Sequence, residues 1–154
     1  MTRKKPALFT IGYEHAKPDA VFRELKKAKV ELLVDVRAVT SSRRPGFSKN
    51  QFAAGLDEHG IGYLHLRGLG TPKEGRVASH SGDLKALWRI YEKHLKTPEA
   101  KEDFAALTGL VESGRRVCLL CYERDVNHCH RLRIAELVHD GTGAKIQNLV
   151  PALF

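Results

Sequence analysis

Long apolar runs are missing from this sequence, and cysteine is scarce. The apolar stretches all fall short of the ~18 residues that a membrane-spanning helix requires, so we predict no transmembrane segment. Residues 1–6 are basic, but the apolar stretch after them ends at Gly12, so we predict no secretory signal and a cytoplasmic protein. The chain has 3 cysteines, an odd and small number that argues against a disulfide framework.

Positive charge is what the sequence has in excess. The 154 residues include 26 Lys and Arg against 18 Asp and Glu, which gives a formal net charge of +8. A chain of this length without linkers or repeats is expected to form a single domain over residues 1–154. Net charge does not determine a fold, but it favours anionic partners. We therefore expect an anionic small molecule or nucleic acid as the partner, and no membrane.

Short apolar runs alternate with helical patterns along the chain, which predicts the α/β fold class. This alternation is typical of a three-layer α/β/α (Rossmann-like) domain with a mostly parallel sheet of about five strands. Helix ends are marked by capping residues, among them Ser48 with Gln51 and, for the last helix, Asn127. The expected strands are 8–12, 32–36, 62–66, 117–121 and 145–150, and the expected helices are 18–29, 48–60, 83–95, 97–114 and 127–141.

Most of the excess charge falls in segments that follow predicted strands, where open α/β sheets bind ligands. Segment 37–49 contains four basic residues, including Arg37 and Arg43, and no acid. Segment 67–82 adds a further net charge of about +2, so six of the eight excess charges lie at one edge. Solvated loops carry charge without binding anything, which is the simpler interpretation. The functional interpretation is an electropositive site for a phosphate-bearing ligand, clamped by Arg37, Arg43 and Arg131.

The segment 121–131 contains the densest chemistry. Cys121 closes a buried strand, Glu123 follows it, and Cys129, His130 and Arg131 are expected in the first turn of the last helix. A helix N-terminus and a nearby cation favour the thiolate form of cysteine, so these residues can supply a nucleophile, an acid or base and an anion clamp. Each also has a structural alternative: Cys121 as a small buried apolar residue, and Arg131 as the ion-pair partner of Glu123.

A metal centre is a second interpretation of the same segment. Cys121, Glu123, Cys129 and His130 are suitable ligands for zinc or iron. Their spacing matches neither Cys-x-x-Cys nor His-x3-His, and adjacent residues on a helix point in different directions. We therefore predict no metal and no other cofactor, and keep a metal-dependent enzyme as an alternative.

Asp35 lies inside an apolar strand, two residues before Arg37. It is either a buried acceptor for a neighbouring arginine or a catalytic acid, and burial requires that it has a partner. The Asp-Val-Arg sequence is similar to that of rhodanese-like domains, which, like cysteine phosphatases, use a Cys-x5-Arg loop. Neither Cys121 nor Cys129 has an arginine at that offset. Cys118 does have Arg124 there, but it lies inside the predicted strand rather than at a loop entrance, so we exclude both classes.

Six spaced motifs stand out along the chain: 10–13, 35–37, 42–47, 63–70, 121–123 and 129–131. Together they resemble one bacterial and archaeal family, domain of unknown function 488, over about residues 8–140. The resemblance implies a small intracellular α/β protein whose motifs lie on the loops described above. One departure is Thr71, which follows Gly70 where many members have a second glycine.

We predict a protein that binds a nucleotide, nucleic acid or sugar phosphate at the carboxyl edge of its sheet, with cysteine-dependent catalysis there. A non-catalytic nucleic-acid-binding module is the main alternative. The predicted catalytic residues are Cys121, Glu123, Cys129, His130 and Asp35. The predicted ligand-binding residues are Gly12, Tyr13, Arg37, Ser42, Arg43, Gly70 and Arg131.

Overall fold

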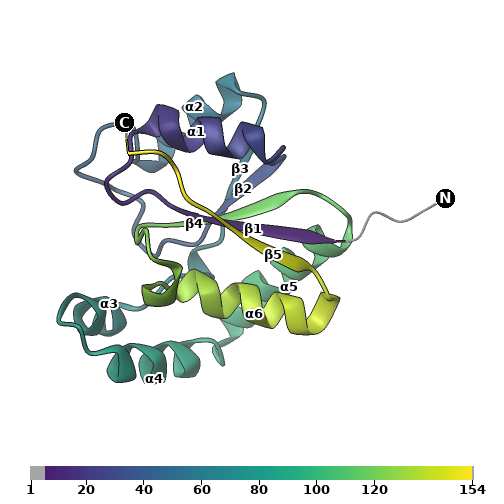
Figure 1. The fold of residues 1–154 in the computed structure, drawn as a ribbon. Coiled ribbons are helices and arrows are strands. Elements are labelled where there is room, and N and C mark those ends of the chain that lie inside the picture. The colour runs from purple at the N-terminus through teal and green to yellow at the C-terminus, as the bar shows by residue number, and fades with distance from the viewer. Residues whose placement is uncertain (1–5, 154) are drawn as a thin grey trace.

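A parallel sheet with helices on both faces forms the centre of the protein, as Figure 1 shows for the computed structural model, which describes residues 6–153. Within these residues the sheet has five strands in the order β3-β2-β4-β1-β5, and every neighbouring pair is parallel. This confirms the predicted three-layer α/β class. The strands are β1 (Ala7–Gly12), β2 (Leu32–Asp35), β3 (Gly62–His65), β4 (Val117–Cys121) and β5 (Lys145–Leu149).

Two groups of helices cover the two faces of the sheet (Figure 1). The helices α1 (Pro18–Lys27) and α2 (Lys49–Glu58) pack on one face, and α5 (Pro98–Glu112) and α6 (His130–Thr142) pack on the other. Between β3 and α5 the chain adds α3 (Lys73–His80) and α4 (Leu84–His94) on the α6 side. No helix in the described part of the chain combines the length and the apolar composition needed to cross a membrane.

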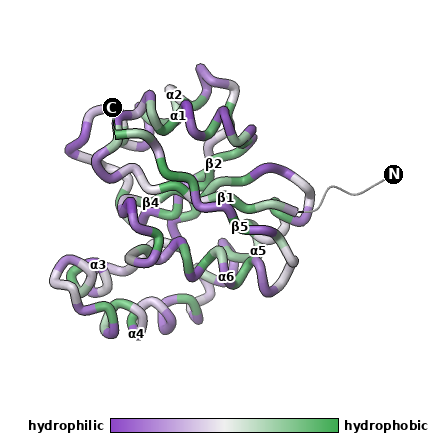
Figure 2. The backbone as a smooth tube through the Cα atoms, viewed as in Figure 1, coloured by the Kyte–Doolittle hydropathy of each residue, from purple (hydrophilic) through white to green (hydrophobic). Residues whose placement is uncertain are grey.

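The central strand β4 is buried along its whole length, which explains its nearly continuous apolar sequence. Alternate side chains enter the two layers: Leu119 and Cys121 face α5 and α6, whereas Cys118 and Leu120 face α1 and α2. Figure 2 shows the central strands as largely hydrophobic, between helices of mixed hydropathy. Burial on both faces gives β4 a well-packed position from which to hold the residues at its carboxyl end.

The connections diverge around that end of β4. The chain leaves β1 and β2 toward the α1 and α2 layer, but it leaves β4 toward α6 (Figure 1). The strand register places Gly12 beside Cys121, and Asp35 beside Leu120. Three of the sequence motifs therefore meet at a topological switch point, where open α/β sheets bind ligands.

Two predictions of secondary structure are wrong: the start of the last helix and the assignment of segment 67–82 as a loop. The last helix begins at His130 rather than near Asn127, because Asp125 caps a separate 3-10 turn, η2 (Val126–His128), and Cys129 is extended. Segment 67–82, predicted as a loop, contains η1 (Arg67–Leu69) and α3. The second error follows from the short length of α3 and from Gly75 in its middle, which packs tightly against Thr71 and lowers the helical signal.

The predicted capping box at the start of α2 does not form. Ser48 is the N-cap residue, but its hydroxyl bonds to the backbone of Ser42, and the Gln51 side chain accepts from the amide of Gly46. The rings of Phe47 and Phe52 instead lie 5.7 Å apart across the helix start, as in a hydrophobic staple. These contacts fold the basic loop 38–48 back onto the sheet edge.

Candidate functional site

A cavity of about 490 Å³ lies outside the carboxyl ends of β1, β2 and β4, with α3 along one side. Of the twelve predicted site residues, seven line it, and the other five each contact or adjoin a lining residue. The predicted site residues therefore gather around one cavity, to which α3 contributes in a way that the sequence did not predict. The lining residues are Tyr13, Arg37, Ala38, Val39, Ser41, Ser42, Arg43, Arg44, Thr71, Arg76, Ser79, His80, Leu87, Cys121, Tyr122, Glu123 and His130.

The lining of the cavity is strongly positive. It includes four arginines, and Glu123 is the one acid among the lining residues. Arg44 is held in place by bonds to the carbonyl oxygens of Tyr13, at 3.0 Å, and Ala16. Arg76 donates to the carbonyl of Thr71 at 3.0 Å, and Arg43 is exposed. Arg44 and Arg76 were not among the predicted ligand-binding residues, although the basic composition of segments 37–49 and 67–82 contained that signal.

Asp35 and Arg37 form a buried ion pair behind the cavity wall. Arg37 donates from Nε to Oδ1 at 2.9 Å and from Nη2 to Oδ2 at 2.8 Å, and Tyr63 donates its hydroxyl to Oδ2 at 2.5 Å. Burial alone would lower the pKa of Arg37, but the hydrogen bonds and charge of Asp35 raise it above its ordinary value. This geometry matches the structural interpretation of Asp35 as a buried acceptor.

The same guanidinium also anchors the basic loop. Arg37 Nη1 donates to the carbonyl of Phe47 at 2.8 Å and to the hydroxyl of Tyr13 at 3.2 Å. The Tyr13 and Phe47 rings stack at 4.4 Å. Arg37 lines the cavity, but most of its donors are used to hold the wall together.

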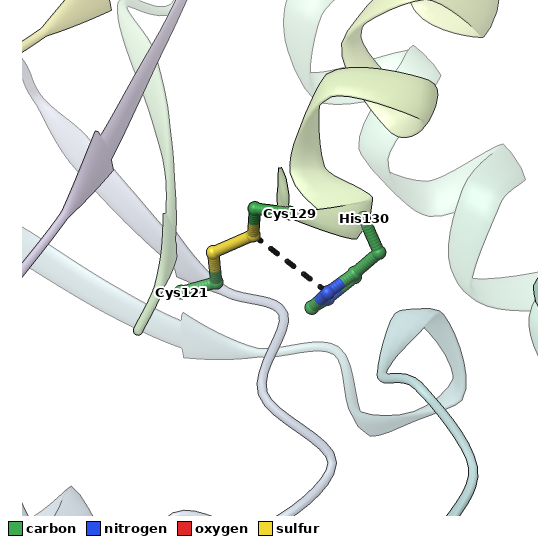
Figure 3. Close-up of side chains that lie close together, drawn as sticks. All are labelled: Cys121, Cys129 and His130. Atoms are coloured by element: carbon green, nitrogen blue, oxygen red, sulfur yellow. Dashed lines mark hydrogen bonds between the residues drawn. A yellow bond between two sulfur atoms is a disulfide. The ribbon is translucent and has the colours of Figure 1, made fainter. Parts of the chain in front are cut away.

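Cys121 and Cys129 are joined by a disulfide (Figure 3). Cys121 comes from the end of β4 and Cys129 is the N-cap residue of α6, so the bond links the sheet to the start of the helix. Both cysteines were predicted as site residues from the sequence, but their pairing was not predicted. Cys118 is free and fully buried, and burial raises the pKa of its thiol.

Arg131 lies directly behind this disulfide. Its Nη1 is 3.0 Å from Cys121 Sγ and also donates to the carbonyl of Glu123. Burial lowers the pKa of Arg131 to about 10, so its guanidinium remains charged at neutral pH. Gly12 makes this approach possible, because a Cβ there would lie 1.8 Å from the Glu123 carbonyl oxygen and 2.9 Å from Arg131 Nη1. The predicted ligand-binding residue Gly12 is thus placed as a packing residue under the site.

Gly70, like Gly12, lies where the backbone of another segment packs too closely for a Cβ. A Cβ at Gly70 would lie 2.4 Å from the backbone nitrogen of Ala38, so the segment after η1 presses against the start of the basic loop. Ser42 lines the cavity, and its hydroxyl accepts from the amide of Arg44 at 3.1 Å. Both residues shape the wall of the cavity.

Besides Arg131, His130 and Glu123 also lie close to the two sulfurs. His130 Nε2 bonds to the carbonyl of Val36 at 2.8 Å, so this nitrogen carries the proton and Nδ1 faces Cys129 Sγ at 3.8 Å. Burial lowers the pKa of His130 to about 4. A Glu123 carboxylate oxygen lies 3.7 Å from Cys121 Sγ, and burial raises the pKa of this carboxyl.

The ligand atoms of Cys121, Cys129 and His130 all lie within 4.8 Å of one another. Once reduced, these three are a suitable set for a soft divalent metal, whereas Glu123 is outside the group. The expectation that Cys129 and His130 point in different directions is wrong, because Cys129 has extended backbone rather than helical backbone.

The fold and site together define an α/β protein with a cysteine pair at a switch point, beside a positively charged cavity. The family model for Domain of unknown function DUF488 matches residues 17–138, and the chain belongs to this family. The search of curated proteins and the search of solved structures each found no match.

Proposed function

We propose that the protein binds a small phosphate-bearing molecule in the cavity and, in its reduced form, acts on it through the thiolate of Cys121. The observation that carries this proposal is the position of Cys121 at the base of a cavity lined by four arginines and one carboxyl group. Guanidinium groups pair well with phosphate oxygens, because their planar donors match two acceptors at once.

The surroundings of Cys121 support a reactive thiol. The Arg131 guanidinium, 3.0 Å from Sγ, favours the thiolate over the thiol. Glu123, 3.7 Å from the same sulfur, is placed to accept its proton, and its raised pKa makes its carboxylate a better base than an exposed one. Together they form a nucleophile with its own base and counter-charge.

The concave shape of the site favours a small molecule over a nucleic acid as the ligand. A cavity of about 490 Å³ lies in the range typical of small-molecule sites. A nucleic-acid-binding module would instead bind with an affinity that falls steeply with salt and does not depend on Cys121.

A protection experiment on reduced protein tests the proposal. Inorganic pyrophosphate should slow the alkylation of Cys121 by neutral iodoacetamide, with the modified cysteine identified by peptide mass spectrometry. Arg43→Ala and Arg76→Ala should weaken the protection, whereas Arg23→Ala, an exposed arginine on α1, should leave it unchanged. Absence of protection at millimolar pyrophosphate would overturn the proposal.

A further inference from the structure

We infer that Cys121 and Cys129 are a two-electron thiol–disulfide couple that reduces an anionic low-molecular-weight disulfide bound in the cavity. This inference rests on the proposed function, since it uses the same cavity and the same nucleophile. It adds the reactive bond of the substrate, a sulfur–sulfur bond, and a role for Cys129.

The two cysteines occupy different positions, which assigns them different roles. Cys121 lines the cavity, whereas Cys129 lies behind it at the N-cap of α6. Cys121 is only 1% exposed, so a substrate must enter the cavity to reach its sulfur. Cys129 makes no capping bond to its helix, and the 13-residue helix presents the positive end of its dipole to the sulfur. Because Cys121 lines the cavity and Cys129 does not, Cys121 is the attacking cysteine and Cys129 the resolving one.

The reaction balances in two steps. The Cys121 thiolate attacks one sulfur of a substrate RS–SR, which forms a Cys121–SR mixed disulfide and releases the first RS⁻. The Cys129 thiolate then attacks Cys121 Sγ, which forms the disulfide present in the structure and releases the second RS⁻. The protein loses two electrons and two thiol protons, and the substrate gains the two electrons. An external dithiol returns the protein to its reduced form.

The cavity distinguishes a disulfide substrate from a peroxide. A peroxide is small and neutral, so it needs neither a cavity of about 490 Å³ nor an arginine-rich lining. An anionic disulfide uses both, because the arginines hold its carboxylates or phosphates and stabilise the departing thiolate.

His130 positions the resolving cysteine. Its Nε2–H donates to the Val36 carbonyl, which fixes the ring and directs the Nδ1 lone pair toward Cys129 Sγ. In the reduced protein this nitrogen can accept a hydrogen bond from the Cys129 thiol and hold its sulfur toward Cys121. We expect His130→Ala to slow the second thiolate release more than the first.

The stoichiometry of thiolate release tests the inference directly. Reduced Cys118→Ala protein is mixed with the dicarboxylate dithiobis(nitrobenzoate), and the coloured thiolate released per chain is counted. Two equivalents and no retained adduct are expected. In Cys118→Ala with Cys129→Ser, one equivalent and a stable adduct on Cys121 are expected. Cys118 serves as the background substitution because it is buried and free.

The possible outcomes separately test the cysteine couple, the anionic ligand and the substrate class. A retained adduct in the protein that has both cysteines, or two equivalents without Cys129, would overturn the couple while leaving the anion site intact. In the protein with both cysteines, a transient adduct on Cys121 before the second release supports the same order of attack without the serine variant. Equal rates with the neutral reagent dithiodipyridine, corrected for a free thiol, would overturn the anionic ligand instead. Faster oxidation by hydrogen peroxide than by either disulfide would overturn the substrate class.

Discussion

The Nη1 nitrogen of Arg131 lies 3.0 Å from the Sγ of Cys121, and both groups are almost completely buried. The contact brings the start of α6 against the end of β4, and Gly12 of β1 leaves the space for it. A buried cation in contact with a sulfur favours the thiolate strongly, because little solvent screens the charge. This relationship is the basis of the reactivity that we propose.

Removal of the Arg131 charge should shift the pH dependence of Cys121. In reduced protein, Arg131→Met should move the alkylation profile of Cys121 to higher pH by about one unit or more, since a cation in contact lowers a thiol pKa by that order. The matched control is Arg133→Met, which removes a partly exposed arginine of the same helix that pairs with Glu92. Identical profiles for the parent protein and both variants would show that Arg131 has no electrostatic role.

Gly12→Ala should disturb the contact between Arg131 and Cys121. The new Cβ would lie 1.8 Å from the Glu123 carbonyl oxygen, so Glu123 and Arg131 must move. We expect a loss of about 1–3 kcal/mol in the free energy of unfolding, as for other overpacked sites, and slower alkylation of Cys121. Gly109→Ala is the control, because a Cβ there meets no atom within 4 Å and helix propensity favours alanine. Equal stability for Gly12→Ala and the parent protein would contradict this account.

Asp35→Asn should destabilise the wall of the cavity. It leaves the Arg37 guanidinium buried without its counter-charge, and breaking a buried pair from one side costs about 3–5 kcal/mol. Chemical denaturation measures the loss, and Asp57→Asn on the exposed surface of α2 should change the stability very little. A catalytic role for Asp35 without a structural one would instead leave the unfolding midpoint unchanged.

The stability of the oxidised protein should fall as the pH is lowered from 7.5 to 5. His130 has a folded-state pKa of about 4, below the 6.5 of the unfolded chain, so the unfolded state binds protons first as the pH falls. For these two values the loss attributable to His130 is roughly 2 kcal/mol at pH 5. His130→Gln should show a correspondingly smaller loss in denaturant titrations at the two pH values. Parallel losses in both proteins would contradict the burial of a neutral histidine.

Metal removal should leave the thiol chemistry intact. The Cys121 nucleophile, its base and its counter-charge are all side chains, so reduced protein stripped by a chelator should be alkylated at the full rate. Added zinc should slow the reaction, because Cys121, Cys129 and His130 place their ligand atoms within 4.8 Å. If the chelator instead abolished the reaction of Cys121, and added zinc restored it, the metal-dependent alternative would be favoured.

The sequence predicted the fold well, and its predicted site residues gather around one cavity, for physical reasons. Apolar strands such as β4 and local caps such as Thr97, which accepts from the amide of Ala100, are encoded by neighbouring residues. The pairing of Cys121 with Cys129 is not encoded by neighbouring residues in this way. It depends on η2, which ends before Cys129 and leaves that residue extended, whereas Asn127 looks like a good N-cap in the sequence.

The contacts of the cavity wall were also predicted only in part from the sequence. Arg37 was predicted as an anion clamp, and Asp35 as either a buried acceptor for a neighbouring arginine or a catalytic acid. The structure adds that Asp35, Tyr13 and Phe47 together use most of the donors of Arg37. Arg76 is brought to the cavity by α3, a helix whose pattern is too short to recognise. Contacts between distant segments therefore account for most of what the sequence did not predict.

The most direct test compares two alkylating reagents that differ in charge. In reduced Cys118→Ala protein, the rate ratio of iodoacetate to iodoacetamide at Cys121 should exceed the ratio for a free thiol by on the order of tenfold, because the arginines concentrate the anion. The excess should fall with added salt and in Arg43→Ala or Arg76→Ala, but not in Arg23→Ala. A ratio equal to that of a free thiol would contradict an anion-binding thiol site.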